Sequence, residues 1–244
     1  MTHQSPQRHV VVGVLSLQGS FREHLGHLDE LFVQLNSAPE YSKYRFSSRK
    51  VREPKDLDGL AGIILVGGES TTISLLLQQT KLLEPLARLI QSGTIGVWGT
   101  CAGLILIANH VTNTKVQLGD RKYELIGGLD VSIERNSFGR QVDSFDQELS
   151  FPAAGIGSFK CVFIRAPTVT DVIGKTPVVG SNSSVVAKVY TKNEAPVEVI
   201  SRVERSGKSM VVGVRQGHIL GSSFHPELVP DYRFHKWFID EFVL

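Results

Sequence analysis

IGVWGTCAGLILIANH, residues 95–110, is the stretch that decides the fold. One apolar run stops at Gly99, Cys101 follows, and a second apolar run begins after Gly103. The G-x-C-x-G spacing is typical of a nucleophile elbow, the sharp turn that joins a buried strand to a helix and holds a reactive side chain at its tip. Glycines on both sides permit such a crowded turn, whereas a cysteine that only fills a core needs none. We therefore expect a strand before Cys101, a nucleophile at Cys101 and a helix over 101–110.

The chain before the elbow alternates between short apolar runs and helical patterns. Strands are expected over 9–19, 44–51 and 62–66, and helices over 20–35, 71–79 and 85–93. Ser20 and Glu23 form an S-x-x-E pattern, which predicts that the Ser20 side chain caps the first helix. Strand followed by helix, repeated, predicts an α/β fold with a mostly parallel twisted sheet and helices on both faces. In such sheets the functional site lies at the carboxyl ends of the strands.

The chain after the elbow is richer in strand patterns. Strands are expected over 161–167, 185–190, 197–203, 210–217 and 219–225, and loops over 35–44 and 144–158. Near the end of the sequence, Phe234, Phe238 and Phe242 repeat every four residues. This spacing predicts a helix that docks on the core through its aromatic side.

Length and composition limit the class of protein. A chain of 244 residues that is 41% hydrophobic and 20% charged suits a single domain over 1–244. The net charge of +2, with no basic block, argues against a nucleic-acid partner. Two cysteines fit a reducing compartment, the first ten residues lack the apolar core of a signal peptide, and the apolar runs are too short to span a bilayer. We expect a soluble cytoplasmic protein that binds neither membranes nor nucleic acid.

A cysteine nucleophile needs a base and a group that orients the base. His225, in GSSFHPEL, follows an expected strand and therefore lies at the carboxyl edge of the sheet. Glu227 is two residues further on, where its carboxylate can accept the other ring N–H of His225. The other histidines fit other places: we expect His24 and His27 to be solvated on the first helix and His110 to end the elbow helix.

GTCAG followed far downstream by SFHPE resembles the class I glutamine amidotransferases. Six blocks occur in the family's order and are similar to the glutaminase subunits of pyridoxal 5'-phosphate synthase: VGVLSLQGSFREH, VGGESTTI, VWGTCAGLILIA, ERNSFGRQVDSF, VFIRAP and SFHPEL. They span about residues 11–228, which is most of the chain. One departure is Val66, where the family usually has proline before Gly-Gly. The resemblance implies a flavodoxin-like three-layer fold and hydrolysis of L-glutamine to L-glutamate and ammonia.

The resemblance also implies roles for residues that match the family's motifs. Cys101 is the implied nucleophile, His225 the base and Glu227 the group that holds the imidazole. Backbone N–H groups of Gly68 and Ala102 are implied to form the oxyanion hole. The other implied glutamine contacts are Gly68 with its neighbours Glu69 and Ser70, and Arg135, Ile164 and Arg165. Arginine suits the α-carboxylate of the substrate, because its planar fork can hold a carboxylate by two hydrogen bonds.

A partner is implied as well. Ammonia would pass to a (β/α)8 synthase subunit in a hetero-oligomer, where it would join ribose 5-phosphate and glyceraldehyde 3-phosphate to make pyridoxal 5'-phosphate. The sequence shows no metal-ligand cluster and no phosphate loop, so we expect neither a metal nor a cofactor in this chain.

Plainer roles fit several of these residues. Glu69 and Ser70 can cap the helix that starts at TTI. Arg135 and Arg140 fit charges on surface loops, and Cys161 fits strand packing. Two other functions also fit the pattern. One is another triad hydrolase of the same fold, such as a γ-glutamyl peptidase or the amidotransferase of another pathway, and the other is a non-catalytic subunit that senses glutamine or scaffolds a complex.

Overall fold

The computed structural model describes residues 6–135, 144–173, 181, 183–188, 193–205 and 207–244. Its α-helices are α1 (Phe21–Ser37), α2 (Ser70–Gln79), α3 (Leu83–Gln91), α4 (Ala102–Ile107) and α5 (Arg233–Phe238), which continues into a π-helix, Ile239–Val243. Short 3₁₀ turns lie at Pro39–Tyr41, Pro54–Leu57, Pro152–Ala154 and Pro226–Leu228. Among the described residues, no helix is long and apolar enough to cross a membrane.

One large sheet forms the centre of the molecule. Its strands are β1 (Arg8–Leu15), β2 (Tyr44–Val51), β3 (Gly62–Leu65), β4 (Gly96–Thr100), β5 (Ala108–Thr112), β8 (Leu129–Glu134), β11 (Thr168–Val172), β12 (Ser184–Val186), β13 (Val197–Arg205), β14 (Lys208–Gln216) and β15 (Ile219–Ser222). Two small antiparallel pairs stand apart from it: β6 (Gln117–Leu118) with β7 (Arg121–Lys122), and β9 (Phe145–Phe151) with β10 (Ile156–Phe163).

The order of the strands divides the sheet into two halves. They follow one another as β12-β5-β8-β11-β14-β15-β4-β3-β1-β2, with β13 paired to β14. Every neighbouring pair from β15 to β2 is parallel, whereas β14 is antiparallel to both β15 and β11. The elbow therefore lies in the parallel half, and the β-rich second part of the sequence supplies most of the antiparallel half.

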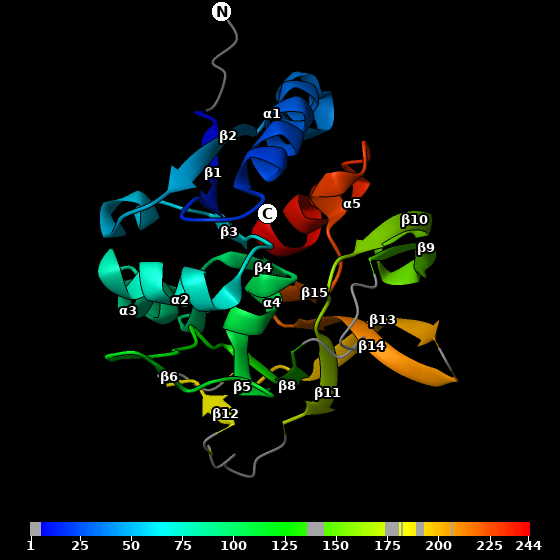
Figure 1. Ribbon diagram of the computed structural model, residues 1–244. Coiled ribbons are helices and arrows are strands. Elements are labelled where there is room, and N and C mark those ends of the chain that lie inside the picture. Colours follow the sequence, from blue (N-terminus) through cyan, green and yellow to red (C-terminus); the bar gives the residue numbers. More distant parts are fainter. Residues whose placement is uncertain (1–5, 136–143, 174–180, 182, 189–192, 206) are drawn as a thin grey trace, which may run out of the picture.

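Helices cover both faces of the parallel half, as predicted. On β3, Ile63 and Leu65 belong to the core under α2, α3 and α4, whereas Ile64 belongs to the core under α1 and α5. β4 repeats the alternation, with Val97 on the first side and Trp98 on the second. Figure 1 shows the two groups of helices on opposite sides of these strands. The α/β fold predicted from the repeated strand–helix pattern is confirmed.

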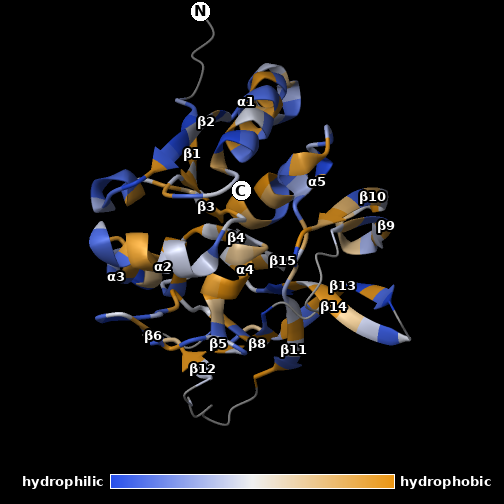
Figure 2. Ribbon diagram, in the orientation of Figure 1, coloured by the Kyte–Doolittle hydropathy of each residue, from blue (hydrophilic) through white to orange (hydrophobic). Residues whose placement is uncertain are grey.

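The helix after the elbow is unusual in being buried all round. All six residues of α4 are buried, and Figure 2 shows mostly apolar colours along it, whereas α1 carries both polar and apolar residues. A helix with no polar face has to lie inside the protein. α4 is thus held by the core on every side, which fixes the turn that precedes it.

Two predictions about element type were wrong. The elbow helix ends at Ile107, and residues 108–112 form β5, which pairs in parallel with β8. Segment 144–158, expected to be a loop, instead forms β9 and the start of β10. Leu149, Phe151 and Phe159 of this hairpin are buried in the core beneath α1 and α5, and that burial stabilises the two strands.

Other predictions match closely. β2 begins and ends where the strand over 44–51 was predicted, and the aromatic helix near the end docks with Phe234 and Phe238 fully buried. Arg140 and the end of the strand predicted over 185–190 lie outside the described residues.

Candidate active site

Cys101 occupies a strained turn at the carboxyl end of β4. Its backbone has φ 47° and ψ −103°, a conformation that side-chain-bearing residues rarely adopt. The Cys101 N–H donates a hydrogen bond to the carbonyl of Ser222 at the end of β15, 2.8 Å away, and α4 begins at the next residue. The turn is thus tied to the neighbouring strand, and it has the strand–turn–helix form predicted from the sequence.

Steric crowding explains the glycine at the helix side of the elbow. A Cβ on Gly103 would lie 1.9 Å from the carbonyl oxygen of Leu65, on the adjacent strand β3. A Cβ on Gly99 would in turn lie 2.7 Å from the carbonyl carbon of Gly103. Both glycines therefore allow the elbow to pack directly on backbone, which no larger residue permits.

His225 follows β15 and lies at the same edge of the sheet. Its N–H donates to the carbonyl of Val162 on β10, 2.8 Å away, and Pro226 starts a 3₁₀ turn that brings Glu227 back toward the ring. Nδ1 of His225 lies 2.8 Å from Oε1 of Glu227, and the Glu227 side chain is fully buried. The predicted base and its predicted orienting group are therefore hydrogen bonded.

The Gly67 backbone packs against both the cysteine and the histidine. A Cβ on Gly67 would lie 2.4 Å from Cε1 of His225 and 3.4 Å from Cβ of Cys101. The turn after β3 thus fits closely against both Cys101 and His225.

The electrostatics favour a charged imidazole. Burial alone would lower the pKa of His225, but hydrogen bonds to Cys101 and Glu227 and attraction to both groups raise the pKa to about 10. For Glu227, burial would raise the pKa, but the charges and hydrogen bonds of His24 and His225 hold it well below its usual range. At neutral pH the arrangement therefore holds a protonated imidazole beside Cys101.

Two partners of Glu227 were missed from the sequence. The Ser20 hydroxyl donates to Oε1 of Glu227 at 2.5 Å and makes no capping hydrogen bond to α1, so the predicted cap at Ser20 was wrong. Nε2 of His24 lies 3.3 Å from Oε2 of Glu227, and His24 is fully buried rather than solvated. His27 is half-buried, and His110 lies in β5 instead of ending the elbow helix.

Glu69 and Arg135 lie together near the start of α2. The Glu69 carboxylate accepts hydrogen bonds from the N–H groups of Thr71 and Thr72, so it caps α2. Arg135 lies 3.4 Å from Oε1 of Glu69 and donates to the Thr114 hydroxyl at 2.7 Å. The plainer reading of Glu69 as a cap is confirmed, and Arg135 is held by an acidic and a hydroxyl partner instead of extending freely from the surface.

Of the remaining predicted residues, Ile164 lies beside the elbow cysteine. The carbonyl oxygen of Ile164 is 4.0 Å from Sγ of Cys101, and Arg165, the next residue, is exposed with φ 43°. Ser70 and Ala102 are buried at the first positions of α2 and α4. A Cβ on Gly68 would lie 2.5 Å from Oε1 of Gln18, which also accepts the Glu69 N–H at 2.9 Å.

Cys161 contrasts with Cys101. It lies within β10, is fully buried in the core, and burial raises the pKa of its thiol. The predicted packing role of Cys161 is confirmed. Cys101 alone combines the elbow with an imidazole neighbour.

Comparison with known proteins identifies the family. The model of the SNO glutamine amidotransferase family matches residues 14–244. The chain belongs to this family. The resemblance drawn from the six sequence blocks is thereby confirmed.

Relatives of this amidotransferase chain include two bacterial proteins named pyridoxal 5'-phosphate synthase subunit PdxT. The protein from Thermus thermophilus is 39% identical over 94% of this chain and 96% of its own, and that from Corynebacterium jeikeium is 40% identical over 94% and 95%. A crystal structure described as a glutamine amidotransferase superposes with a TM-score of 0.69 at 35% identity, covering 94% of this chain and 97% of that one. The glutamine amidotransferase fold is therefore confirmed.

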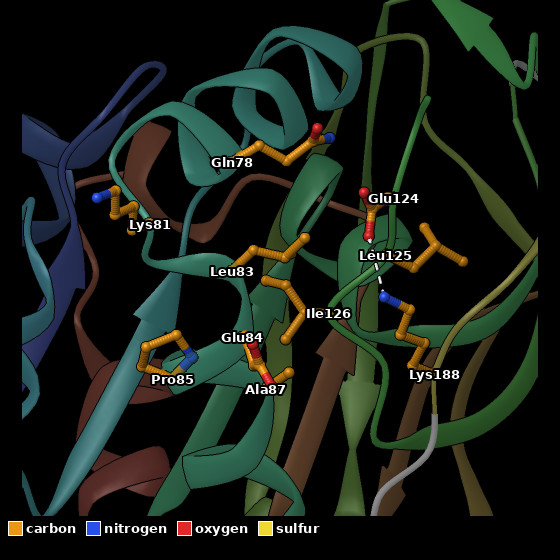
Figure 3. A pocket seen from close by; sticks show the side chains of 10 residues that line it. All are labelled: Gln78, Lys81, Leu83, Glu84, Pro85, Ala87, Glu124, Leu125, Ile126 and Lys188. Carbon is orange, nitrogen blue, oxygen red and sulfur yellow. Dashed lines mark ion pairs between the residues drawn. The ribbon is translucent and has the colours of Figure 1, made fainter. Parts of the chain in front are cut away.

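A cavity of about 580 Å³ lies away from the elbow of this amidotransferase. Figure 3 shows its lining from α2, α3 and the segment 124–126, with Glu124 facing Lys188 across a 3.9 Å ion pair. Neither cysteine nor any histidine lines it. Because a nucleophile and a base are needed for amide hydrolysis, the edge of the sheet around Cys101, and not this cavity, is the candidate active site.

Proposed function

We propose that this chain is a single-domain glutaminase that hydrolyses L-glutamine to L-glutamate and ammonia through a thioester on Cys101. The observation that carries the proposal is the strained Cys101 elbow beside the buried His225–Glu227 pair. Membership of a glutamine amidotransferase family supports glutamine as the substrate.

The chemistry follows from the imidazolium beside Cys101. The Cys101 thiolate attacks the side-chain amide carbon of glutamine, and a C–S bond forms as negative charge moves to the oxygen. Backbone N–H groups of Gly68 and Ala102 would stabilise that oxyanion, an interaction whose loss typically costs about 100-fold or more in rate. His225 gives its proton to the nitrogen, the C–N bond breaks and ammonia leaves. Water then attacks the thioester, His225 takes a proton, and the C–S bond breaks to release glutamate.

The α-carboxylate of glutamine needs a cationic group within reach of the elbow. Arg165 is exposed one residue after Ile164, whose carbonyl lies near Sγ of Cys101. The Arg135 side chain pairs with Glu69, the residue that follows Gly68 and caps the start of α2. We assign Glu69, Ser70, Arg135, Ile164 and Arg165 to substrate binding, with Glu69 also capping α2.

The ammonia would be passed to a synthase partner. The relatives named as subunits of pyridoxal 5'-phosphate synthase support a synthase as that partner. We propose that the partner is a (β/α)8 subunit and that the two form a cytoplasmic hetero-oligomer. Ammonia released into water at pH 7 diffuses away and is mostly protonated to ammonium, which is not a nucleophile. Transfer within a complex avoids this loss.

The test is the release of glutamate and ammonia from glutamine by the purified chain, alone and with the synthase subunit. The same assay with γ-glutamyl peptides separates a glutaminase from a peptidase. Turnover of glutamine and not of the peptides is expected. Faster turnover of the peptides, or none of either substrate with the partner present, would contradict the proposal.

A further inference from the structure

Behind Glu227, a row of buried side chains leads away from Cys101. Oε2 of Glu227 lies 3.3 Å from Nε2 of His24, and Nδ1 of His24 lies 2.9 Å from Nε2 of His235. His24 comes from α1 and His235 from α5, and both are fully buried. The Trp98 ring packs against both histidines, in edge-on contacts with His24 and His235 at centroid distances of 5.8 and 5.0 Å. Two helices thus place a histidine pair against the carboxylate that orients His225.

The proton positions follow from the carboxylate. The pKa of Glu227 is held well below its usual range despite burial, so at neutral pH the carboxylate is ionised and can only accept hydrogen bonds. Oε1 accepts from the Ser20 hydroxyl and from Nδ1 of His225. Oε2 has no hydrogen bond of good geometry among the described residues, but it faces Nε2 of His24 at 3.3 Å, so this nitrogen must carry a proton. The Thr100 hydroxyl lies 3.4 Å from the same nitrogen and can accept that proton as well.

His235 fixes the other side of the His24 ring. Burial and the neighbouring His24 and His27 hold the pKa of His235 well below its usual range, so His235 is neutral and has one N–H. Among the described residues, Nδ1 of His235 has no hydrogen-bond partner. Nε2 of His235 and Nδ1 of His24, 2.9 Å apart, share one proton between them. This contact holds the side of the His24 ring that faces away from Glu227, while the proton on Nε2 faces the carboxylate.

We propose that His24 is a positioning residue for catalysis: it holds Oε2 of Glu227, and His235 holds the opposite ring nitrogen of His24. This proposal rests on the glutaminase function proposed above. Without His24, the buried carboxylate keeps its two contacts at Oε1 but loses the contact that fixes its rotation. His225 would then be less well oriented toward Cys101. His24 touches neither substrate nor thiol, so it acts only through Glu227.

The test compares His24→Leu and His24→Gln with Leu28→Ala. Leu removes the donor, whereas Gln can place an N–H near the position of Nε2. Leu28 lies one turn further along α1, is equally buried and faces only apolar core, so Leu28→Ala controls for loss of packing. We expect His24→Leu to lower kcat by about 10- to 100-fold, the range seen for side chains that orient metal-ligating residues in other enzymes, with KM changed less than about twofold. His24→Gln should restore part of the loss, and Leu28→Ala should keep kcat despite a lower Tm.

A double-mutant cycle separates positioning from general damage. If His24 acts through Glu227, His24→Leu should cost less than about twofold in a Glu227→Gln background. An equal loss of kcat in both backgrounds would overturn the proposal, as would a wild-type kcat in His24→Leu.

A readout that needs no glutamine distinguishes this proposal from the function itself. In a Cys161→Ala background, the rate of Cys101 alkylation by iodoacetamide at neutral pH should fall in His24→Leu and stay unchanged with Leu28→Ala. If the wild type, with its partner, does not hydrolyse glutamine but alkylation responds in this way, the proposed function is wrong and the positioning role stands. If glutamine is hydrolysed and His24→Leu changes neither kcat nor the rate of Cys101 alkylation, the positioning role is wrong.

Discussion

Nδ1 of His225 lies 2.8 Å from Oε1 of Glu227, with both side chains buried at the edge of the parallel sheet. The contact fixes which ring nitrogen of His225 carries a proton when the imidazole is neutral. The opposite nitrogen is then free to exchange a proton with Cys101. One short hydrogen bond thus connects the local motif H-P-E to the chemistry of the elbow, 124 residues earlier in the chain.

Substitution of His225 should lower the rate of glutamine hydrolysis more than substitution of Glu227. We expect His225→Asn to remove nearly all glutamine hydrolysis, because no other proton donor lies at Cys101 among the contacts described. Glu227→Gln should lower kcat by a smaller factor, since an orienting carboxylate often costs less to lose than the base or nucleophile. Steady-state ammonia release, with the synthase subunit present, measures both. A Glu227→Gln enzyme with wild-type kcat would require another orienting group for His225.

The pKa of Glu227 predicts a pH dependence of stability. Although burial would raise this pKa, His24 and His225 hold it well below the ordinary value of 4.5. A carboxyl group with a depressed pKa stabilises the folded state above its unfolded pKa and loses this contribution as the pH falls through the folded value. The Tm difference between wild type and Glu227→Gln should therefore be largest at neutral pH and shrink below pH 4.5. Thermal unfolding at several pH values measures it, and a difference that grows on acidification would contradict the assignment.

The crowded elbow predicts opposite effects for two glycines. Gly103→Ala would place a Cβ 1.9 Å from the Leu65 carbonyl oxygen, so the elbow or β3 has to move. We expect a loss of at least about 3 kcal/mol in unfolding free energy, in the range of severe core overpacking, together with loss of activity. Gly26→Ala is the matched control, because nothing lies within 4 Å of a Cβ at this exposed position of α1. It should raise stability by about 0.5–1 kcal/mol, and equal effects of the two substitutions in denaturant unfolding would refute the steric account.

The synthase partner should raise the activity of this chain. A glutaminase that worked freely would release ammonia to water, and the Gly67–Gly68 turn that lies against His225 is a segment whose orientation a docked partner can select. We expect weak turnover by the chain alone and a higher kcat when the synthase subunit is added. A tenfold rise corresponds to about 1.4 kcal/mol of differential stabilisation. Equal kcat values with and without the partner, at saturating glutamine, would contradict activation by the synthase subunit.

The triad residues could be predicted from sequence because each lies in a short local motif. Cys101 is marked by its glycines, and His225 by the strand before it and Glu227 after it. The parallel half of the sheet was predictable for a similar reason, since strand and helix patterns alternate within it. Each of these signals lies in residues that are close together in the chain.

The contacts behind Glu227 depend on residues far apart in the chain. Ser20 was predicted to cap α1, yet its hydroxyl is donated to a carboxylate 207 residues away, and a hydrogen bond to a charged acceptor is the stronger one. His24 was predicted to be solvated. The sequence did contain a signal, because His24, Leu28, Leu31 and Leu35 share one face of α1 and the last three are apolar. A histidine in such a row is buried unless the helix turns away from the core.

The predicted boundaries of secondary-structure elements were wrong where complete burial left no alternation of polar and apolar residues in the sequence. α4 is buried on all sides, so no alternation marked its end at Ile107 or the start of β5. In β9, by contrast, Phe145, Gln147, Leu149 and Phe151 point one way and the residues between them are exposed. That period of two was present in the sequence, and it is typical of a strand, not of the loop that we expected.

Cys101→Ala tests the central claim most directly. Ammonia release from saturating glutamine should be abolished in Cys101→Ala, while Cys161→Ala, which changes only a buried thiol of β10, keeps most of the wild-type rate. A glutamine-analogue alkylating agent should label Cys101 alone. Normal turnover in Cys101→Ala, or a label on Cys161, would contradict the account.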